Sequence, residues 1–347
     1  MNARRLVAVL FIISMLFLYV LYQYNNASKF PTLKGPYLGQ TLPGDSAQVF
    51  APNIVSTGFY NRDLAMTPDG KEIYFGVVLG NHDLATIMQT KEIKGKWTEP
   101  EVASFATHPD YKYMEPAISP DGKRFYFVSN IPKKGGDDNL DDYDIWVMQK
   151  TETGWGEPEN LGAPVNTEGP EFFPSITREG TLYFTRDNLS DRTSAIFRSR
   201  LVDGNYQPPK KLGPVVNGAV SQFNAYVAPD ESFLIVPMYG RDDSFGATDY
   251  YICFRDADDT WTGPFHLDAS INSKSGQEYS PYVSPDGKFF FFMAPRPVKT
   301  LKEKRGALYP MTREKLNRHF LSPDNGNPNI CWISTDFIKN IKKNQFP

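Results

Sequence analysis

Cysteine and net charge are scarce in this chain, and each shortage removes a class of protein. Cys253 and Cys331 are the only cysteines among 347 residues, so there is no disulfide framework of the kind that stabilises small secreted domains. Both lie in predicted strands, where a cysteine behaves as a small buried apolar side chain. The formal net charge is −3, and no long basic face carries interleaved aromatic residues. We therefore expect no nucleic-acid partner.

Signatures of catalysis and metal binding are also missing. There is no G-x-S-x-G motif, so a serine hydrolase of that type is not expected. None of the four histidines lies in a pair with metal-ligand spacing. One acidic stretch, Asp137-x-Asn139-x-Asp141, resembles part of a calcium loop but lacks the following Gly and the closing Glu. We expect no metal and no cofactor, with Ca²⁺ at this loop as the alternative.

One long hydrophobic run is present, close to the N-terminus. Residues 6–22, LVAVLFIISMLFLYVLY, contain no charge and follow Arg4 and Arg5. A run of this length can cross a bilayer, and the arginines predict that the N-terminus stays in the cytoplasm. We expect residues 1–24 to be a cytoplasmic stub and signal-anchor in the inner (cytoplasmic) membrane, with the remainder in the periplasm or outside the cell. Secretion after cleavage of a signal peptide is the alternative.

Aromatic residues make up 14% of the chain and gather in short clusters, which favours β-strands over a helical bundle. Five clusters follow the same turn, as in SPDGKRFYF at residues 119–127. The turn acids recur at intervals of 51 to 58 residues and are Asp69, Asp121, Glu179, Asp230 and Asp286. We expect the acid to cap its own turn and the following glycine, such as Gly122, to adopt a positive φ. These acids are therefore structural.

A second signal recurs between the turns. It is an aromatic residue three or fewer positions before a proline, in KWTEP, GWGEP, NYQPP and TWTGP. An asparagine follows eight residues after the last three of these prolines, at Asn166, Asn217 and Asn272. Each period of about 50 residues then holds four short strands, A to D, which is the pattern of one propeller blade.

The two ends of the repeat indicate a closed ring. The fifth unit lacks its last strand, while residues 47–58, ahead of the first unit, resemble such a strand. Pairing the two would remove the exposed sheet edges. We predict an all-β propeller of five four-stranded blades, closed by an N-terminal strand that pairs with the last blade, with six blades as the rival. The expected parts are a linker at 25–46, the propeller at 47–340 with blades at about 59–106, 107–167, 168–218, 219–273 and 274–340, and a tail at 341–347.

The repeated PDGK-x-x-Y-F, D-I-W and G-W-x-x-P-x-N-L-G segments resemble the WD-repeat-like propeller repeats of the TolB type. The resemblance covers residues 47–340 and implies a fold, since such repeats serve as scaffolds, binding modules and enzymes. Two units depart from the pattern, with Arg178-Glu179-Gly180 for Pro-Asp-Gly in the third and Glu231 for Gly in the fourth. The additional N-terminal domain of TolB is also replaced here by the hydrophobic run and linker.

Candidate ligand-binding residues come from the positions that differ between blades. Six residues before each turn acid lie Asp63, Glu115, Phe173, Asn224 and Ser280, and eight before lie Asn61, Tyr113, Glu171, Gln222 and Glu278. Period-two alternation places both rows on one side of strand A, at the mouth of the channel. Arginines close by suit an anionic group, because a guanidinium pairs bidentately with carboxylate or sulfate. They are Arg62, Arg186, Arg241 and Arg296.

Two functions remain open from the sequence. The first is a membrane-tethered propeller without catalysis that binds a partner protein or an envelope polysaccharide. The alternative is a carbohydrate-active enzyme, a lyase or glycoside hydrolase, acting on an anionic glycan, for which Glu171 and Glu278 would be the carboxylate pair. One insertion, residues 296–318, holds eight Lys and Arg against two Glu, and within it TREKLNRHF predicts a short helix with Thr312 as N-cap. Three interpretations of this insertion remain open: a lid over the channel, a basic surface that contacts an anionic lipid or polymer, or a loop that is simply exposed to solvent.

Overall fold

The computed structural model describes residues 30–80, 82–133, 140, 142–274 and 278–346. The chain divides into two units, residues 1–33 and residues 34–347, and all the described strands belong to the second. The hydrophobic run 6–22 and the acidic positions 137, 139 and 141 lie outside the described residues. Among the described residues, no helix is long and apolar enough to span a bilayer.

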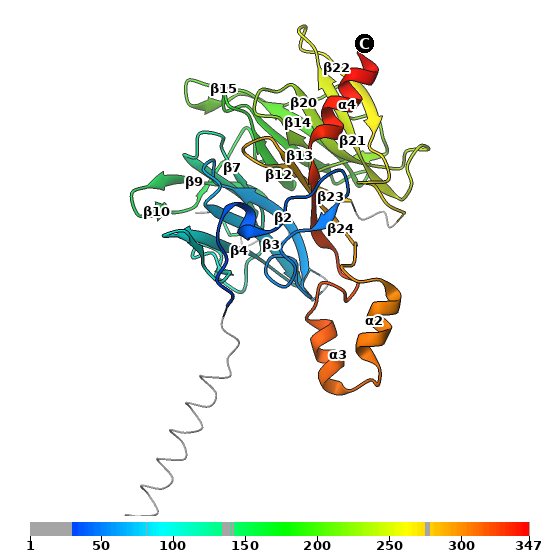
Figure 1. The fold of residues 1–347 in the computed structure, drawn as a ribbon. Coiled ribbons are helices and arrows are strands. Elements are labelled where there is room, and N and C mark those ends of the chain that lie inside the picture. The colour runs from blue at the N-terminus through cyan, green and yellow to red at the C-terminus, as the bar shows by residue number, and fades with distance from the viewer. Residues whose placement is uncertain (1–29, 81, 134–139, 141, 275–277, 347) are drawn as a thin grey trace, which may run out of the picture. The chain divides into compact units, whose positions relative to one another are not determined.

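The second unit is an all-β propeller of five blades, as predicted (Figure 1). In each blade an inner strand A pairs with B, B with C, and C with a short outer strand. Blades 1 and 2 consist of β2 (Tyr60–Met66), β3 (Glu72–Leu79), β4 (Leu84–Ile93), β5 (Lys96–Trp97) and β6 (Glu101–Val102), then β7 (Tyr113–Ile118), β8 (Arg124–Ser129), β9 (Asp144–Thr151), β10 (Gly154–Trp155) and β11 (Glu159–Asn160).

The other three blades follow the same order with small variations. Blade 3 adds a two-stranded hairpin, and strand A of blade 4 is split in two. Their strands are β12 (Glu171–Ile176), β13 (Leu182–Asn188), β14 (Thr193–Ser199), β15 (Leu201–Val202), β16 (Asn205–Tyr206) and β17 (Lys210–Lys211); β18 (Ser221–Gln222), β19 (Tyr226–Val227), β20 (Phe233–Tyr239), β21 (Thr248–Arg255) and β22 (Trp261–His266); and β23 (Tyr279–Val283), β24 (Phe289–Ala294) and β25 (Asn329–Ser334).

The ring is closed by strand β1 (Gln48–Val49), which comes from the start of the unit and lies beside β25 as the outer strand of blade 5. Val49 is opposite Cys331, and the Phe50 amide donates to the Ile330 carbonyl at 2.8 Å. The predicted closure is therefore confirmed. It gives the edge of blade 5 a hydrogen-bonding partner, so the chain ends do not leave an open sheet.

The repeated acidic turns have the predicted structural role. In blade 2 the Asp121 carboxylate accepts from the Ser119 hydroxyl at 2.6 Å and from the Lys123 amide at 3.1 Å. Gly122 has φ 70°, a conformation that glycine adopts without strain. Glu231, which replaces this glycine in blade 4, has φ 57° and accepts from the Tyr183 hydroxyl and from Arg255. Those two bonds offset the cost of the left-handed backbone.

Apolar side chains fill the spaces between neighbouring blades. One cluster joins Tyr126 and Ile145 of blade 2 to Leu182 and Phe184 of blade 3, all at most 1% exposed. Equivalent clusters lie between blades 1 and 2, 3 and 4, and 4 and 5. Burying one large apolar side chain contributes roughly 1.5–3 kcal/mol. The strands are apolar on both faces because each sheet is covered on both sides by a neighbour.

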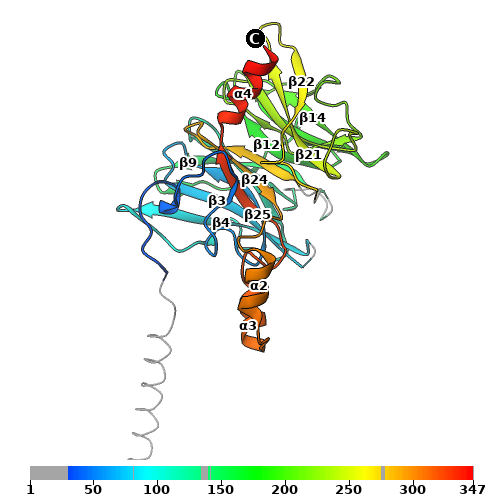
Figure 2. The ribbon, with the colours of Figure 1, turned by 45° about the vertical axis from the view of Figure 1, so that its right-hand side comes forward.

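Four short helices accompany the strands in the described part of the chain, and sequence reasoning predicted one of them. They are η1 (Pro36–Gly39), α2 (Leu301–Leu308), α3 (Arg313–Phe320) and α4 (Asp336–Gln345). Helix α3 begins after Thr312, whose hydroxyl accepts from the Lys315 amide at 3.2 Å, as predicted. Helices α2 and α3 form a hairpin between strands B and C of blade 5 that projects from the propeller (Figures 1 and 2). Helix α4 continues past residue 340, where the sequence placed the end of the propeller.

Candidate functional site

Every inner strand carries the same backbone irregularity at the position six residues before its turn acid. Asp63, Glu115, Phe173, Asn224 and Ser280 all have a positive φ, between 49° and 61°. The pairing register shifts at this point in blades 1, 2, 3 and 5, which marks a β-bulge. A positive φ costs a residue other than glycine roughly 1–2 kcal/mol. The bulge interrupts the period-two alternation, so the two candidate rows make different contacts.

The inner row forms a hydrogen-bonded ring inside the channel. Arg62 lies between two carboxylates, with Nε 2.9 Å from Asp63 Oδ2 and Nη2 2.8 Å from Glu115 Oε1. The Ser280 hydroxyl donates to the other oxygen of Asp63, and the side-chain amide of Asn224 donates to Glu115 Oε1 at 3.4 Å. Contacts therefore run between blades 1, 2, 4 and 5 at the centre of the molecule.

The carboxylates of this ring are almost inaccessible to solvent. Asp63 is 2% exposed and Glu115 is 4% exposed. Glu115 also accepts from the Phe173 amide at 2.6 Å, which joins blade 3 to the ring. Burial raises the pKa of Glu115 to about 7; Arg62 opposes the rise and Asp63 adds to it. The ring closes the middle of the channel and holds the five bulges in place.

The outer row fixes the loop that enters each blade. In four blades a side-chain oxygen accepts from the backbone amide of a residue three to five positions earlier. The pairs are Asn61 with Thr57 at 2.7 Å, Glu171 with Thr167 at 3.0 Å, Gln222 with Ala219 at 3.0 Å and Glu278 with Ser273 at 3.0 Å. Tyr113 packs with Phe127 in the cluster between blades 1 and 2. The row therefore supports the loops between strand D and strand A.

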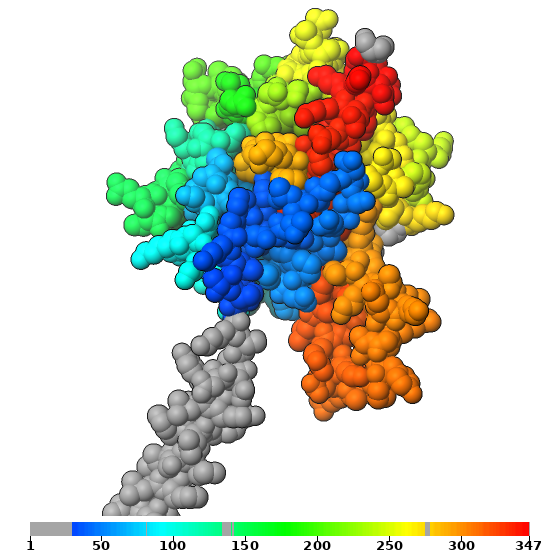
Figure 3. Space-filling model, in the orientation of Figure 1, coloured from blue at the N-terminus to red at the C-terminus, as the bar shows by residue number. Residues whose placement is uncertain are grey.

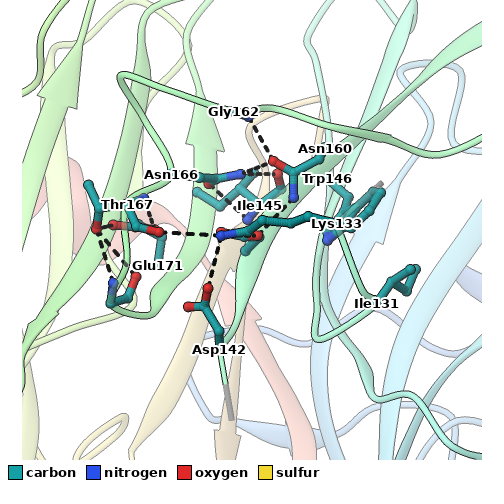
Figure 4. Close-up of polar contacts among 12 residues, drawn as sticks. Ile131, Lys133, Asp142, Ile145, Trp146, Asn160, Gly162, Asn166, Thr167 and Glu171 are labelled. Carbon is teal, nitrogen blue, oxygen red and sulfur yellow. Dashed lines mark hydrogen bonds and ion pairs between the residues drawn. The ribbon is translucent and has the colours of Figure 1, made fainter. Parts of the chain in front are cut away.

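Figure 4 shows this arrangement where blade 2 leads into blade 3. Thr167 donates to Glu171 through both its amide and its hydroxyl, and burial raises the pKa of Glu171. Beside it, Asn166 accepts from the Ile145 amide at 3.1 Å and donates to the Ile145 carbonyl at 2.9 Å. Asn217 and Asn272 bond Ile196 and Tyr250 in the same way. The repeated asparagine thus extends strand C by one pair of hydrogen bonds.

Unlike Arg62, the other three candidate arginines contact groups close to their own blade. Arg186 donates to Glu171 at 2.7 Å and to the Val165 carbonyl at 2.6 Å. Arg296 donates to the Ile271 carbonyl at 2.8 Å, the equivalent contact in blade 5. Arg241 pairs with Asp243 at 2.9 Å and lies over the ring of Tyr251. The structure brings Arg62, Asp63, Glu115 and Asn224 together at the centre. The other charged and polar candidates do not join this group: Glu171 pairs with Arg186 inside blade 3, and Tyr113, Arg241, Glu278 and Arg296 make their contacts in blades 2, 4 and 5.

A cavity of about 570 Å³ occupies the other half of the channel, between the buried ring and the A–B turns. This volume is within the range typical of small-molecule and peptide sites. Its walls come from the second half of each strand A, including the prolines that follow three of the bulges, Pro116, Pro174 and Pro281. Tyr226 and Tyr282 also line it, and the Tyr282 hydroxyl accepts from the Met66 amide at 3.0 Å. The walls are therefore mainly apolar and conformationally restricted.

Charged side chains line the cavity toward the A–B turns. Helix α4 contributes Lys339 and Lys342, both exposed, and the turns contribute Arg178, Asp230 and Asp286. Of the positions named from the sequence, the charged and polar candidates are absent from the described residues that line this cavity, whereas Phe173 of the inner row does line it. A usable sequence signal was the proline at the same offset in MEPAI, EFFPSI and YSPYV, which marks the strand positions facing the channel.

Metal-binding groups are not evident in this part of the molecule. Among the described residues there is no group of three or more His, Cys, Asp or Glu side chains placed to hold an ion. The calcium-like stretch lies outside them. Hydroxyl groups also line the cavity; one is that of Ser175, which accepts from the Val227 amide at 2.9 Å.

Comparison with known proteins gives likenesses to solved propellers. No protein-family model matches the chain, and neither does any curated protein. A structure of TolB from Acinetobacter baumannii is 17% identical, with a TM-score of 0.44, over 80% of this chain and 62% of that one. The endo-arabinase from Bacteroides thetaiotaomicron VPI-5482 is 14% identical, with a TM-score of 0.47, over 77% of this chain and 94% of that one. Hydrazine synthase from Kuenenia stuttgartiensis is 16% identical, with a TM-score of 0.38, over 74% and 68%. The chain spans less than two thirds of the TolB chain that it matches.

Proposed function

We propose that this chain is an extracytoplasmic, membrane-tethered β-propeller that acts as a binding module, and that it holds a segment of a partner protein in its central cavity. The observation that carries the proposal is the cavity itself. It is about 570 Å³, its walls are mainly proline, tyrosine and aliphatic side chains, and charged groups surround its outer end. Apolar walls with a few polar groups are the usual composition of a binding pocket.

The contacts of the polar residues favour binding over catalysis. Glu171 and Glu278, the carboxylate pair of the enzymatic alternative, are both fully buried and each accepts from the loop of its own blade. Asp63 and Glu115 are buried and engaged with Arg62. A glycoside hydrolase needs two carboxyl groups that face the same bond of the substrate.

An extended peptide fits the cavity better than a sugar chain. Prolines and aliphatic groups line it, whereas glycan sites are rich in donors and acceptors for hydroxyl groups. Tyr226 is only 9% exposed, so it offers little free ring surface for stacking on a sugar. An envelope polysaccharide remains the second ligand class to be tested.

Thermal unfolding of the full chain in detergent, with and without ligand, tests the proposal. The panel holds hexapeptides with apolar and aromatic residues, and oligosaccharides that carry uronate or sulfate groups. A ligand present at a hundred times its dissociation constant stabilises by about 2.7 kcal/mol, which shifts the melting temperature by several degrees. The variant Lys339→Glu/Lys342→Glu, changed at two exposed positions of α4 that line the cavity, is measured beside the wild type.

Stabilisation of the wild type by peptides, reduced in the variant, supports the proposal. If only the oligosaccharides stabilise the protein, the ligand of the cavity is a glycan and not a peptide. No stabilisation by any member of the panel contradicts a binding role for the cavity.

A further inference from the structure

The hairpin of α2 and α3 is an ordered part of the propeller unit. Thr300 and Glu303 form a reciprocal capping box at the start of α2. At the base, Asn325 and Asn327 both donate to the Gly58 carbonyl, at 2.7 and 2.9 Å. The caps and the hydrogen bonds to Gly58, just before blade 1, each restrict the chain. The hairpin therefore has a defined conformation and is not a loosely solvated loop.

The side chains of the two helices are nevertheless largely exposed to solvent. Neither helix contains a buried residue. Three large apolar side chains are exposed to an unusual degree: Tyr309 is 82% exposed, Met311 is 72% exposed and Phe320 is 67% exposed. The space-filling view shows the hairpin standing away from the propeller (Figure 3). Tyr309 and Met311 lie in the loop between the helices, whereas Phe320 ends α3 at the base, where Asn325 donates to its carbonyl at 2.7 Å. Exposed apolar side chains on a projecting element indicate a surface that is covered in the working state.

Positive charge accompanies these apolar groups. Residues 296–318 hold eight Lys and Arg against Glu303 and Glu314. A cavity of about 240 Å³ between the helices and the base is lined by four of these cations, together with Ala307, Leu308, His319, Ser322 and Asp324; the cations are Lys299, Lys304, Lys315 and Arg318.

Two of the lysines at this cavity already contact oxygens of the hairpin and its base. Lys304 donates to the Asp324 carbonyl at 3.0 Å and lies 3.9 Å from the Asp324 carboxylate, and Lys315 donates to the Tyr309 carbonyl at 2.8 Å. Arg318 pairs at 3.2 Å with Glu314, and both side chains are at least 70% exposed. Such an exposed pair is worth little, so Arg318 can exchange its partner at small cost. Lysine and arginine side chains are common partners of phosphate oxygens.

We propose that the α2–α3 hairpin docks on the surface of an anionic phospholipid bilayer, with a lipid phosphate in the basic cavity and Tyr309 and Met311, in the loop between the two helices, at the level of the headgroups. Charge complementarity and exposed aromatic and apolar groups are the two terms that bind a peripheral element to such a surface. Each Lys or Arg near an anionic leaflet contributes about 1 kcal/mol.

The segment between the charge-free run and the propeller unit is short. Tyr22, the last residue of the charge-free run, is twelve residues before Lys34, where the propeller unit begins. A fully extended chain of twelve residues spans at most about 43 Å. This step rests on the membrane tether of the proposed function, whereas the charge and the exposed apolar groups do not depend on it.

Docking through the hairpin would also set the orientation of the central cavity. The hairpin connects strands B and C of blade 5, and the B–C connections lie at the end of a blade opposite its A–B turns. The A–B turns and α4 line the central cavity. A hairpin on the membrane therefore directs the cavity away from the bilayer, toward a partner.

A fluorescent label at residue 311 tests the contact in the full chain. Both native cysteines are fully buried, so Met311→Cys provides one accessible thiol. The labelled chain is incorporated into vesicles of phosphatidylcholine alone or with phosphatidylglycerol, each containing lipids with a headgroup spin label that quenches nearby fluorescence. Lys123→Cys, at an exposed A–B turn of blade 2, carries the same label as the control.

We expect strong quenching at residue 311 with phosphatidylglycerol, at least threefold less in neutral vesicles, and little at residue 123 in either. The added substitutions Lys302→Gln, Arg305→Gln and Arg313→Gln, all at exposed positions, should bring the signal at residue 311 to the neutral level, because three charges contribute on the order of a hundredfold in affinity. An unchanged melting temperature shows that these variants are folded.

Equal quenching in neutral and anionic vesicles, or none in both, overturns the proposal. A response of the label to soluble polyglutamate but not to anionic vesicles also overturns it, since the surface would then fit an acidic protein. A chain that stays with the vesicles while residue 311 remains unquenched disproves the hairpin contact and leaves the tethered binding module standing.

Discussion

Val49 lies opposite Cys331, although 282 positions separate them in the chain, and this pair closes the ring of five blades. Because the Phe50 amide donates to the Ile330 carbonyl in the neighbouring pair, Val49 and Cys331 form a non-hydrogen-bonded pair, in which the side chains are closest. The relationship explains why the first strand of the unit is indispensable to the last blade.

Closure predicts that Val49→Cys will form a disulfide with Cys331 under mild oxidation. The crosslink closes a very long loop and should stabilise by up to about 5 kcal/mol in the chain-entropy account. Urea unfolding of the oxidised and reduced forms measures the difference. The double variant Val49→Cys/Cys331→Ala cannot crosslink and should show none. Failure to crosslink in the folded protein would mean that the ring is not closed in this register.

The buried ring predicts a large cost for removing its arginine. Arg62→Met leaves Asp63 and Glu115 without a countercharge, and breaking a buried pair in this way costs about 3–5 kcal/mol. Arg241→Met, which removes an exposed pair with Asp243, should cost less than about 1 kcal/mol. Urea unfolding at pH 8 compares them. If both variants lose a similar free energy of unfolding, the buried central ring contributes no more to stability than an exposed ion pair.

The raised pKa of Glu115 predicts a pH dependence. An unfolded glutamate ionises near pH 4.5, whereas Glu115 in the folded protein ionises near pH 7. The folded state therefore retains this proton over the interval between, so the stability contributed by the site is complete below about pH 4.5 and is lost as the pH rises through about 7.

Melting temperatures of the wild type and of Glu115→Gln, measured from pH 4.5 to pH 8, isolate this contribution. The difference between wild type and variant should become less favourable to the wild type as the pH rises, whatever the absolute stability of the variant. A difference that is constant with pH, or that changes in the opposite direction, would place Glu115 in a less buried setting.

The repeated asparagines predict a matched series. Asn166→Ala and Asn272→Ala each leave a buried amide and carbonyl of strand C unpaired, which costs about 2 kcal/mol. Asn217→Ala should cost less, because Asn217 is only half-buried. Asn205→Ala, in the exposed β15–β16 hairpin, is the control and should change the free energy of unfolding by less than about 0.5 kcal/mol. Equal changes in the free energy of unfolding for all four variants would contradict the role of the asparagines in extending strand C.

Sequence reasoning predicted the elements that recur. The Asp121–Gly122 turn, the four-stranded unit and the closing strand all follow from local turn chemistry and from the missing strand of the fifth unit. Thr312 at the start of α3 is a cap of ordinary type, and the Thr300-x-x-Glu303 box that starts α2 carried the same kind of signal but was not used.

The candidate site was harder to predict, for a definite physical reason. Alternation along a strand predicts side-chain direction only while the backbone is regular, and five residues with a positive φ break it. The residue types at these positions, such as Asp63, Glu115 and Asn224, differ from blade to blade and do not by themselves predict a bulge. Arg186 and Arg296 looked available for an anion, but carbonyls of the preceding loop take up their guanidinium groups. Such pairing depends on contacts between distant segments.

The central claim is that the cavity beside the A–B turns is where this propeller binds its partner. Titration calorimetry with the peptide that gives the largest thermal shift tests it most directly, using wild type, Lys339→Glu/Lys342→Glu at the cavity and Arg241→Met away from it. The account predicts one site per chain, an affinity at least tenfold weaker in the α4 variant, and an affinity within twofold of wild type for Arg241→Met. Equal affinity in all three proteins, or a loss confined to Arg241→Met, would contradict it.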